Sequence, residues 1–408
     1  MANNATSTVN MVAANLAARN AVLANSIEMI QNLNDGVGTY NPANTTVITL
    51  KPIMAGLTKG FYINVSVDIV NLGTNTLYLT EQGISQIFSS IILTDTNSIQ
   101  RINTDGFHVA MLNAIRFKTP LGSTRSISNS DSDFGSNYNT VSIPSSIATN
   151  TALTPAKATF TIYIPLAYAG NDLRGAIYTN VANASMNIQL NINPNAITTA
   201  TAASAPVRTG AQINSCYANA TAVGATGAYV SSITVTGRQV FLNNLPAWSN
   251  SYPAQFNQGG TLLPIGDLSV YYQMIKSFPQ LNLAAGTKSP IPYAPQRSYL
   301  TNLLVYNNGN TLNNGTDLTS INIETANQIP FLQGDPYFLS QLVENDMRFD
   351  LPYGTYLINR RHSPINTINY GNMQINVTPS TVNAGAYVID YNEFFSYAGV
   401  TNTAQAIA

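Results

Sequence analysis

The stretch Phe61-Tyr-Ile-Asn-Val-Ser-Val-Asp-Ile69 decides the fold class, because apolar residues occupy every second position and polar residues lie between them. This two-residue period is typical of a strand with one buried face. Residues 160–166, 186–192 and 373–377 repeat it. Alternation of this kind indicates antiparallel sheets packed face to face, and a doubly wound parallel sheet would instead show continuous apolar strands separated by helices.

Residues 10–34, which precede these strands, show the period of a helix. The residues that define the helix are the apolar positions and the arginine in the gap between them, namely Val12, Leu16, Arg19, Leu23, Ile27 and Ile30. The segment is rich in Ala and runs into Asn34-Asp-Gly36, a favourable helix stop. It could pack on its own domain, or it could be an arm that reaches a neighbouring subunit or an apolar surface. It lacks the Lys/Arg-rich face of an independent membrane binder, so any membrane contact would depend on assembly.

Two short helices within the β-rich region resemble each other. One is expected to begin at Asp105 and the other at Asp335, and both segments end in Arg-Phe. Each follows an expected hairpin, the first turning near residues 95–97 and the second at Asn308-Gly309. The repetition predicts two β-sandwich units in tandem. Residues 243–260, rich in Asn, Pro and Gly, are expected to link them.

Composition excludes several functions. Only 9% of the 408 residues are charged and the net charge is −1, so the chain has no global electrostatic footprint for nucleic acid. A weakly charged exterior favours association with other chains. No apolar run reaches the ~18 residues of a transmembrane helix, and the first residues do not resemble a secretory signal. The Ser/Thr/Asn/Ala-rich stretches 118–157 and 194–228 are expected to be functional loops or loops packed against a partner.

Catalytic and metal-binding patterns are weak. The only cysteine, Cys216, is expected to be a small core residue, and the two histidines, His108 and His362, have no zinc spacing. No nucleophile elbow, phosphate loop or dinucleotide fingerprint is present. We therefore expect no enzyme activity, no cofactor and no metal. Residues 129–135 resemble a calcium loop only superficially, because the glycine is one place late and Thr140 stands where Glu is needed.

The remaining charged residues have structural interpretations. Turn and cap positions account for Asp35, Asp105 and Asp335, and solvated or capping carboxylates are expected elsewhere, including Asp390 and Glu393. Glu344 and Asp346 are two residues apart on a helix and so point to different faces. A salt bridge or an interface is expected for Arg360-Arg361.

A series of segments spread along the chain resembles the major capsid protein of tectiviruses, tailless icosahedral bacteriophages with an internal membrane. The segments that carry the resemblance are residues 11–23, 40–44, 59–61, 164–168, 172–173, 175–176, 263–269, 314–317, 370–372 and 378–383. None of them is a catalytic signature, and the resemblance to this family rests on their order and spacing together.

The resemblance implies two tandem eight-stranded jelly rolls per chain and a homotrimer that forms a pseudo-hexagonal tile of an icosahedral shell. The shell would surround an internal membrane that encloses the viral DNA, so no direct nucleic-acid binding is needed. The expected divisions are an N-terminal helical arm over 1–35, a first jelly roll over 36–242, the linker 243–260, a second jelly roll over 261–397 and a C-terminal tail over 398–408. The arm would face the membrane and adjacent capsomers.

The resemblance also implies partners and a location. The partners would be neighbouring capsomers and minor capsid, vertex and membrane-associated viral proteins, with assembly in the bacterial cytoplasm. An alternative is a secreted or surface carbohydrate-binding β-sandwich protein. The many Tyr and Asn residues are compatible with sugar binding. A β-sandwich hydrolase is a third alternative, but no pair of carboxylates supports it.

Overall fold

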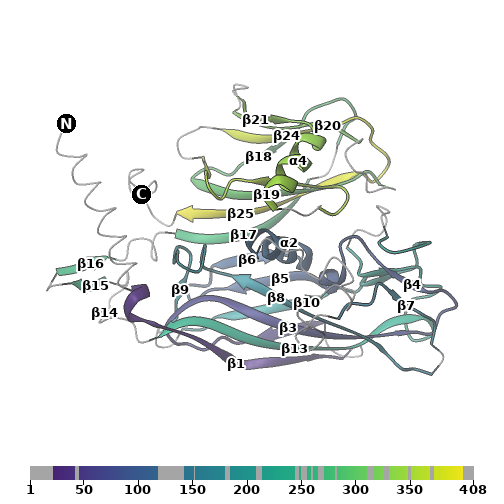
Figure 1. Cartoon of the computed structure of the whole chain (residues 1–408), viewed down its shortest axis with the longest axis horizontal. Coiled ribbons are helices and arrows are strands. Elements are labelled where there is room, and N and C mark those ends of the chain that lie inside the picture. Colours follow the sequence, from purple (N-terminus) through teal and green to yellow (C-terminus); the bar gives the residue numbers. More distant parts are fainter. Residues whose placement is uncertain are drawn as a thin grey trace.

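The computed structural model describes most of the chain between residues 22 and 397. The described ranges are 22–41, 46–117, 142–150, 152–179, 184–207, 214–243, 248–249, 255–258, 261–264, 271–280, 283–309, 317–325, 330–347, 351–367 and 372–397. The predicted mainly-β class is confirmed, and the strands form two stacked sandwiches (Figure 1).

The first sandwich, here called the first roll, has two facing sheets. One has the strand order β1 (Ile27–Tyr40), β13 (Ala228–Asn243), β3 (Leu57–Asn71) and β8 (Ala156–Pro165), with the short β9 (Ile177–Tyr178) also paired to β3. The other has the order β2 (Val47–Leu50), β10 (Asn187–Ile192), β5 (Phe88–Thr94) and β6 (Gln100–Thr104). Along β3 the apolar residues of the alternating stretch are buried and the polar ones are half-buried, as the sequence predicts.

The second sandwich, the second roll, repeats this plan. One sheet has the order β17 (Tyr271–Gln280), β25 (Tyr387–Tyr397), β19 (Arg297–Asn307) and β22 (Thr355–Asn359), with β23 (Ile365–Asn366) also paired to β19. The other has the order β18 (Ser289–Pro292), β24 (Met373–Pro379), β20 (Leu318–Thr325) and β21 (Pro330–Gly334). Taken in chain order, the strands of the two rolls occupy equivalent places, so the predicted duplication into two jelly rolls is confirmed.

The two predicted helices occupy equivalent places as well. Helix α2 (Gly106–Phe117) follows β6, and helix α4 (Pro336–Met347) follows β21. The predicted caps are present: Asp105 Oδ1 accepts the backbone N–H of His108 at 2.9 Å, and Asp335 Oδ1 accepts that of Phe338 at 2.7 Å. A 3₁₀ helix, η1 (Ile84–Ile87), precedes β5.

The helix predicted over residues 10–34 is wrong at its C-terminal end. Within the described part of this segment only residues 22–25 are helical, and Ile27 and Ile30 belong to the fourteen-residue strand β1. This strand pairs antiparallel with β13, and the register shifts between Asn32 and Val37, so Asn34-Asp-Gly36 lies within β1 and does not end a helix. The partner strand β13 comes much later in the chain, with Ile27 paired to Asn243 and Tyr40 to Ile233. Local periodicity cannot reveal a pairing with so distant a segment. Consequently the expected helical arm over 1–35 does not extend past residue 25, and its earlier residues lie outside the described part.

The second predicted hairpin, at Asn308-Gly309, is also wrong. β19 pairs with β25 along one edge and with β22 and β23 along the other. It therefore has no free edge for a hairpin partner. The chain instead crosses to the opposite sheet after Gly309, which has a φ of 81°. The hairpin that precedes α4 joins β20 to β21 and is the equivalent of the correctly predicted β5–β6 hairpin.

Part of the chain expected as long loops also forms small sheets. β11 (Ile197–Thr198), β12 (Tyr217–Ala218), β4 (Leu77–Leu79) and β7 (Ser146–Ile147) form one of them at the end of the first roll. Cys216 is fully buried there, which confirms its expected core role. β14 (Trp248–Ser249), β15 (Gln255–Gln258) and β16 (Thr261–Pro264) form a second small sheet between β13 and β17. Residues 118–141, with the calcium-like segment, and residues 398–408 lie outside the described part.

In the described part of the chain, no helix is both long enough and apolar enough to span a bilayer. Nor does any group of three or more His, Cys, Asp or Glu side chains there have an arrangement that could hold a metal ion.

Candidate functional site at the junction of the two rolls

The two rolls share one continuous sheet. Strand β6, at the edge of the first roll, pairs in parallel with β17 of the second roll through Ile102 with Ile275 and Asn103 with Lys276. The joined sheet therefore runs β2-β10-β5-β6-β17-β25-β19-β22. Helix α2 lies between the rolls (Figure 1). The apolar core of the first roll continues across this junction to Tyr391 of β25.

A buried ion cluster crosses the junction. Glu393 of β25 is fully buried, and its Oε1 accepts a hydrogen bond from Arg116 Nη2 of helix α2 at 2.7 Å. Its Oε2 accepts one from Arg361 Nη1 at 2.6 Å, and Gln273 Nε2 donates to Oε1 at 2.6 Å. Burial alone would raise the pKa of Glu393, but the charges of Arg361 and Arg116 and their hydrogen bonds outweigh it and hold that pKa below its ordinary value.

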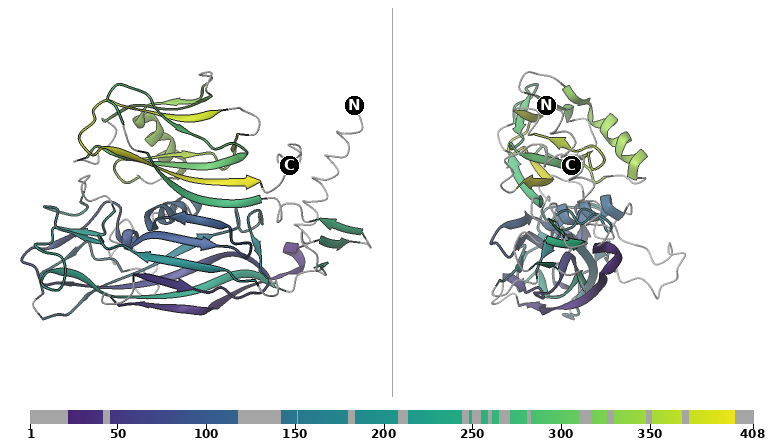
Figure 2. Two further views of the ribbon diagram at one scale, coloured as in Figure 1. Left: turned by 180° about the vertical axis from the view of Figure 1, so that it is seen from behind. Right: turned by 90° about the vertical axis from the view of Figure 1, so that its left-hand side faces the viewer.

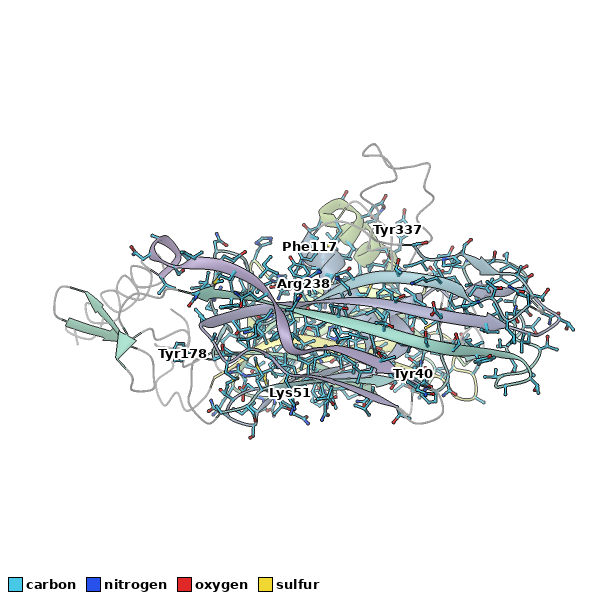
Figure 3. All side chains as sticks on the ribbon, turned by 90° about the horizontal axis from the view of Figure 1, so that it is seen from below. Tyr40, Lys51, Phe117, Tyr178, Arg238 and Tyr337 are labelled. Atoms are coloured by element: carbon cyan, nitrogen blue, oxygen red, sulfur yellow. The ribbon has the colours of Figure 1, made fainter. Side chains whose placement is uncertain are left out.

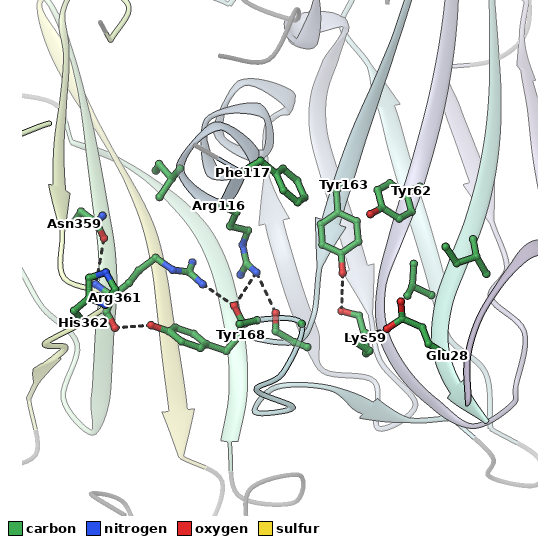
Figure 4. A pocket seen from close by; sticks show the side chains of 16 residues that line it. Glu28, Lys59, Tyr62, Arg116, Phe117, Tyr163, Tyr168, Asn359, Arg361 and His362 are labelled. Carbon is green, nitrogen blue, oxygen red and sulfur yellow. Dashed lines mark hydrogen bonds and ion pairs between the residues drawn. The ribbon is translucent and has the colours of Figure 1, made fainter. Parts of the chain in front are cut away.

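The arginines of this cluster also bind the backbone of the first roll. Arg116 Nη1 donates to the carbonyls of Ala167 and Tyr168 at 3.1 and 3.0 Å, and Arg361 Nη2 donates to the Tyr168 carbonyl at 2.7 Å. The Tyr168 hydroxyl donates in return to the Arg361 carbonyl, and the guanidinium of Arg361 stacks 4.5 Å from the Tyr168 ring centroid (Figure 4). The expected salt bridge at Arg360-Arg361 is therefore confirmed for Arg361.

A second polar contact joins the rolls at the start of α2. Asp105, which caps the helix, also accepts a hydrogen bond from the Tyr391 hydroxyl of the second roll. Burial raises the pKa of Asp105 to about 6. His108 packs against the Tyr391 ring at 4.9 Å between centroids, and its Nδ1 shares a 2.8 Å hydrogen bond with Thr104 Oγ1. Burial lowers the pKa of His108 to about 3, so this imidazole is neutral.

The expectation of solvated or capping carboxylates is wrong for two residues near the C-terminus. Glu393 and Asp390 are both buried in β25, Glu393 as the centre of the ion cluster and Asp390 as an acceptor from the side-chain amides of Asn302 and Asn392. The presence of Asp390 and Glu393 in one central strand is a sequence signal for buried polar partners. Charged side chains are buried in such a strand only where other groups pair with them or donate hydrogen bonds to them. The sequence could not show that Arg116, 277 residues away, is one of these partners.

The predicted arm residues do not form one surface in the described part. Val12, Leu16 and Arg19 lie outside it. Leu23 is half-buried against a small cluster that includes Val22 and Leu57. Ile27 and Ile30 are exposed, at 59% and 56%, on the edge strand β1.

A hollow of about 450 Å³ opens beside the junction (Figure 4). Its wall combines β1 and β3 of the first roll, the end of α2, and Asn359, Arg361 and His362 of the second roll. A second hollow, of about 330 Å³, lies along α4 and shares Asn359 and His362 with the first. Four large apolar or aromatic side chains are exposed at the end of α2 and on α4: Phe117, Tyr337, Phe338 and Leu342. Phe117 and Tyr337 lie on the same side of the molecule (Figure 3).

The carboxylates that line the two hollows are engaged by neighbouring side chains: Glu28 pairs with Lys59, and Asp346 accepts a hydrogen bond from Asn359. What the geometry offers is a rigid double sandwich with an apolar flank. Comparison with known families decides between the remaining interpretations. A family model described as P3 major capsid protein N-terminal matches residues 2–245, and one described as P3 major capsid protein C-terminal matches residues 269–408.

The chain belongs to the P3 major capsid protein family.

A curated member of this family, the major capsid protein P3 of Enterobacteria phage PRD1, is 29% identical over 94% of this chain and 91% of its own length. Solved structures share the double jelly-roll fold at low identity. One is a structure of Sulfolobus Turreted Icosahedral Virus (11% identical, TM-score 0.61, covering 93% of this chain and 95% of that one). Another is the PBCV-1 virus capsid (11% identical, TM-score 0.51, covering 91% and 93%).

Membership of the P3 family establishes the general role of the chain. It is a major capsid protein, a structural component of the virion capsid and not an enzyme. It assembles with other capsomers into that capsid. The carbohydrate-binding alternative has no support.

Proposed function

We propose that this P3 family protein forms a homotrimer in which six jelly rolls make a pseudo-hexagonal capsomer. The observation that carries the proposal is the equivalence of the two rolls, strand for strand and helix for helix. Three copies of a chain with two equivalent units provide six similar walls, and a three-fold ring closes through one patch meeting a different patch on the next copy. The low charge of the chain and the exposed aromatic side chains of α4 support a large contact between copies.

In this proposal the capsomers tile an icosahedral shell around an internal membrane that encloses the viral DNA. The residues before β1, including Val12, Leu16 and Arg19, would contact the membrane or adjacent capsomers. Minor capsid, vertex and membrane-associated viral proteins would be further partners. The near-neutral charge of the chain supports a shell that does not bind DNA directly, and assembly would take place in the bacterial host cytoplasm.

The trimer is tested by the mass of the purified protein in solution. Light scattering on a sizing column should give three times the chain mass of 43.7 kDa, and the value should persist on dilution because obligate interfaces commonly bury more than 2,000 Å². A stable monomer, or a dimer, would contradict the proposal.

The role of the N-terminal residues is tested by a deletion. Removal of residues 1–21 leaves β1 and the helical residues 22–25 in place, so the product should still be a trimer, with three times the mass of the shortened chain, and its unfolding temperature should not change. The yield of closed particles in phage-producing cells, counted by electron microscopy, should fall strongly. Normal particle yield would show that these residues are dispensable for the shell, and a monomeric product would place them in the trimer contact instead.

A further inference from the structure

Three polar side chains from neighbouring strands meet on the outer face of the second roll. Lys288 directly precedes the edge strand β18, Asn376 lies in its partner strand β24, and Glu324 lies in the next strand, β20. These strands belong to the sheet of the second roll that is farther from the first roll (Figure 2). The inner face of this sheet carries core residues such as Ile323 and Ile375, so the three polar side chains lie on its outer side.

The carboxyl group of Glu324 contacts both nitrogen atoms. Lys288 Nζ lies 3.3 Å from Glu324 Oε1 and 3.4 Å from Oε2, and Asn376 Nδ2 donates a hydrogen bond to the same Oε1. An amine and a side-chain amide are therefore held on one oxygen atom. The carbonyl oxygen of that amide, Asn376 Oδ1, accepts a hydrogen bond from Gln374 Nε2 at 3.1 Å. Lys288, Glu324, Asn376 and Gln374 are called the amide cluster below.

Burial differs within the amide cluster in a way that suits a reaction between two of its members. Asn376 and Glu324 are both buried, so water has little access to the amide carbon. The side chain of Lys288 is 52% exposed, and its flexible four-carbon stem can turn Nζ from Glu324 toward Asn376 Cγ. The nucleophile is thus free to move while the amide that it would attack is fixed.

The strand beside Lys288 is weakly held by its own backbone. β18 has only four residues and lies at the edge of its sheet. Two of the four are Pro290 and Pro292, which have no N–H group to donate to β24. A covalent link between Lys288 and β24 would fasten this edge strand where backbone hydrogen bonds are few.

We propose that Lys288 and Asn376 form an isopeptide bond within the chain, with Glu324 as the group that transfers protons. The bond is an amide between Lys288 Nζ and Asn376 Cγ, and it joins the start of β18 to β24. The reaction uses only groups of the amide cluster and needs no cofactor or oxidant. It adds a site of covalent modification to a capsid protein without making the chain an enzyme.

The steps balance in atoms and in charge. The Glu324 carboxylate takes a proton from the Lys288 ammonium, which leaves a neutral amine with a free electron pair. This pair attacks Asn376 Cγ and forms the Nζ–Cγ bond, while Gln374 Nε2 donates to the oxygen that gains negative charge. Nζ then loses a second proton, and Glu324 passes both protons to the departing Nδ2 group as the Cγ–Nδ2 bond breaks. One ammonium ion leaves, and nothing is oxidised or reduced.

Mass spectrometry of the purified wild-type protein tests the proposal. The denatured chain should weigh one ammonia less than its sequence. Trypsin should leave residues 277–297, uncut at Lys288, joined to the C-terminal peptide 362–408, which contains Asn376 and has no Lys or Arg. This branched peptide distinguishes the proposed bond from loss of ammonia at an isolated asparagine.

Two variants should keep the full mass of their sequences and give no branched peptide. Lys288→Arg keeps a positive charge beside the carboxylate but removes the amine, and Glu324→Gln removes the group that moves the protons. The matched control is Lys276→Arg, which changes another lysine of the second roll, one that donates to the Gln100 carbonyl at 2.8 Å. The control should lose one ammonia and give the branched peptide, as the wild type does.

The other outcomes overturn the proposal. A wild-type chain of full mass would show that the amide cluster is only a hydrogen-bond network. Loss of ammonia without a branched peptide, or a loss that persists in Lys288→Arg, would place the chemistry at other residues. A branched peptide in Glu324→Gln would overturn the role of Glu324 in moving protons. If the buried Glu324→Gln change prevents folding, Lys288→Arg decides the test, because Lys288 is exposed.

Discussion

Replacing Glu393 by Gln is expected to lower the free energy of unfolding by about 3–5 kcal/mol at pH 7, because removal of one member of a buried ion cluster leaves uncompensated charge. The change preserves the size of the side chain and removes only its charge. Arg116 and Arg361 would then lie buried side by side with no carboxylate between them. Since these arginines come from different rolls, we expect the junction to open before the rolls themselves unfold.

Two substitutions provide controls for this effect. Asp390→Asn changes a buried carboxylate on the same strand, three residues away, but burial raises the pKa of Asp390 to about 6. Its charge at pH 7 is therefore disfavoured in the folded state, and removing it should leave stability unchanged or raise it. Glu344→Gln changes an exposed acid of α4 and should change stability by at most about 0.5 kcal/mol.

Urea unfolding of the three variants at one protein concentration measures the difference. Fixing the concentration matters, because association of folded chains contributes to apparent stability. Equal losses in the free energy of unfolding for Glu393→Gln and Asp390→Asn would contradict the prediction. They would show that the loss depends on removing a buried carboxylate and not on its pairing with arginine.

Acidification is expected to destabilise the wild-type protein through His108, and the variant His108→Gln should lack this loss. The folded pKa of His108 is about 3, below the ordinary value of 6.5. Between these values the unfolded chain binds a proton that the folded chain does not, so stability falls as pH falls. At about 1.4 kcal/mol per pH unit, acidification from pH 6.5 to 4.5 removes about 3 kcal/mol through this site.

Other buried groups act in the opposite direction in this range. The pKa values of Asp105 and Asp390 are raised to about 6, so between pH 6 and their ordinary value the folded chain binds protons that the unfolded chain does not, and stability rises as pH falls. Both residues are present in the wild type and in His108→Gln. Their effects cancel in the difference between the two proteins, which isolates the histidine.

The measurement is the free energy of unfolding of both proteins at several pH values from 7 to 4.5. The difference in stability, wild type minus variant, should fall by about 3 kcal/mol over this interval. Any constant cost of the Gln side chain does not alter the slope. Parallel pH curves for the two proteins would show that His108 is not the source of acid sensitivity.

Much of the fold could be predicted from local sequence, because local patterns reflect local burial. The alternation in residues 61–69 corresponds to β3, whose inner face lies on the core of the first roll. The capping aspartates 105 and 335 mark both helices to the residue, because a cap is a contact between neighbours in sequence. The equivalence of the two helices then indicated the duplication.

The errors in the prediction arose where a distant partner decides the structure. Residues 27–34 have a helical period, but pairing with β13 makes them a strand. Asn308-Gly309 is a favourable hairpin turn, but both edges of β19 are occupied by strands from later in the chain. The ion cluster of Glu393 was missed for the same reason, since its partners Arg116 and Arg361 come from separate rolls.

The sheet that runs through both rolls has a mechanical consequence. A hinge between the rolls would have to break the β6–β17 hydrogen bonds and expose the buried Glu393 cluster, so the chain should respond to load as one stiff plate. A closed shell needs curvature, and tiles in flat and in sharply bent regions must meet at different angles. A stiff tile cannot supply that difference by bending, so the angular adjustment must occur at the seams between capsomers.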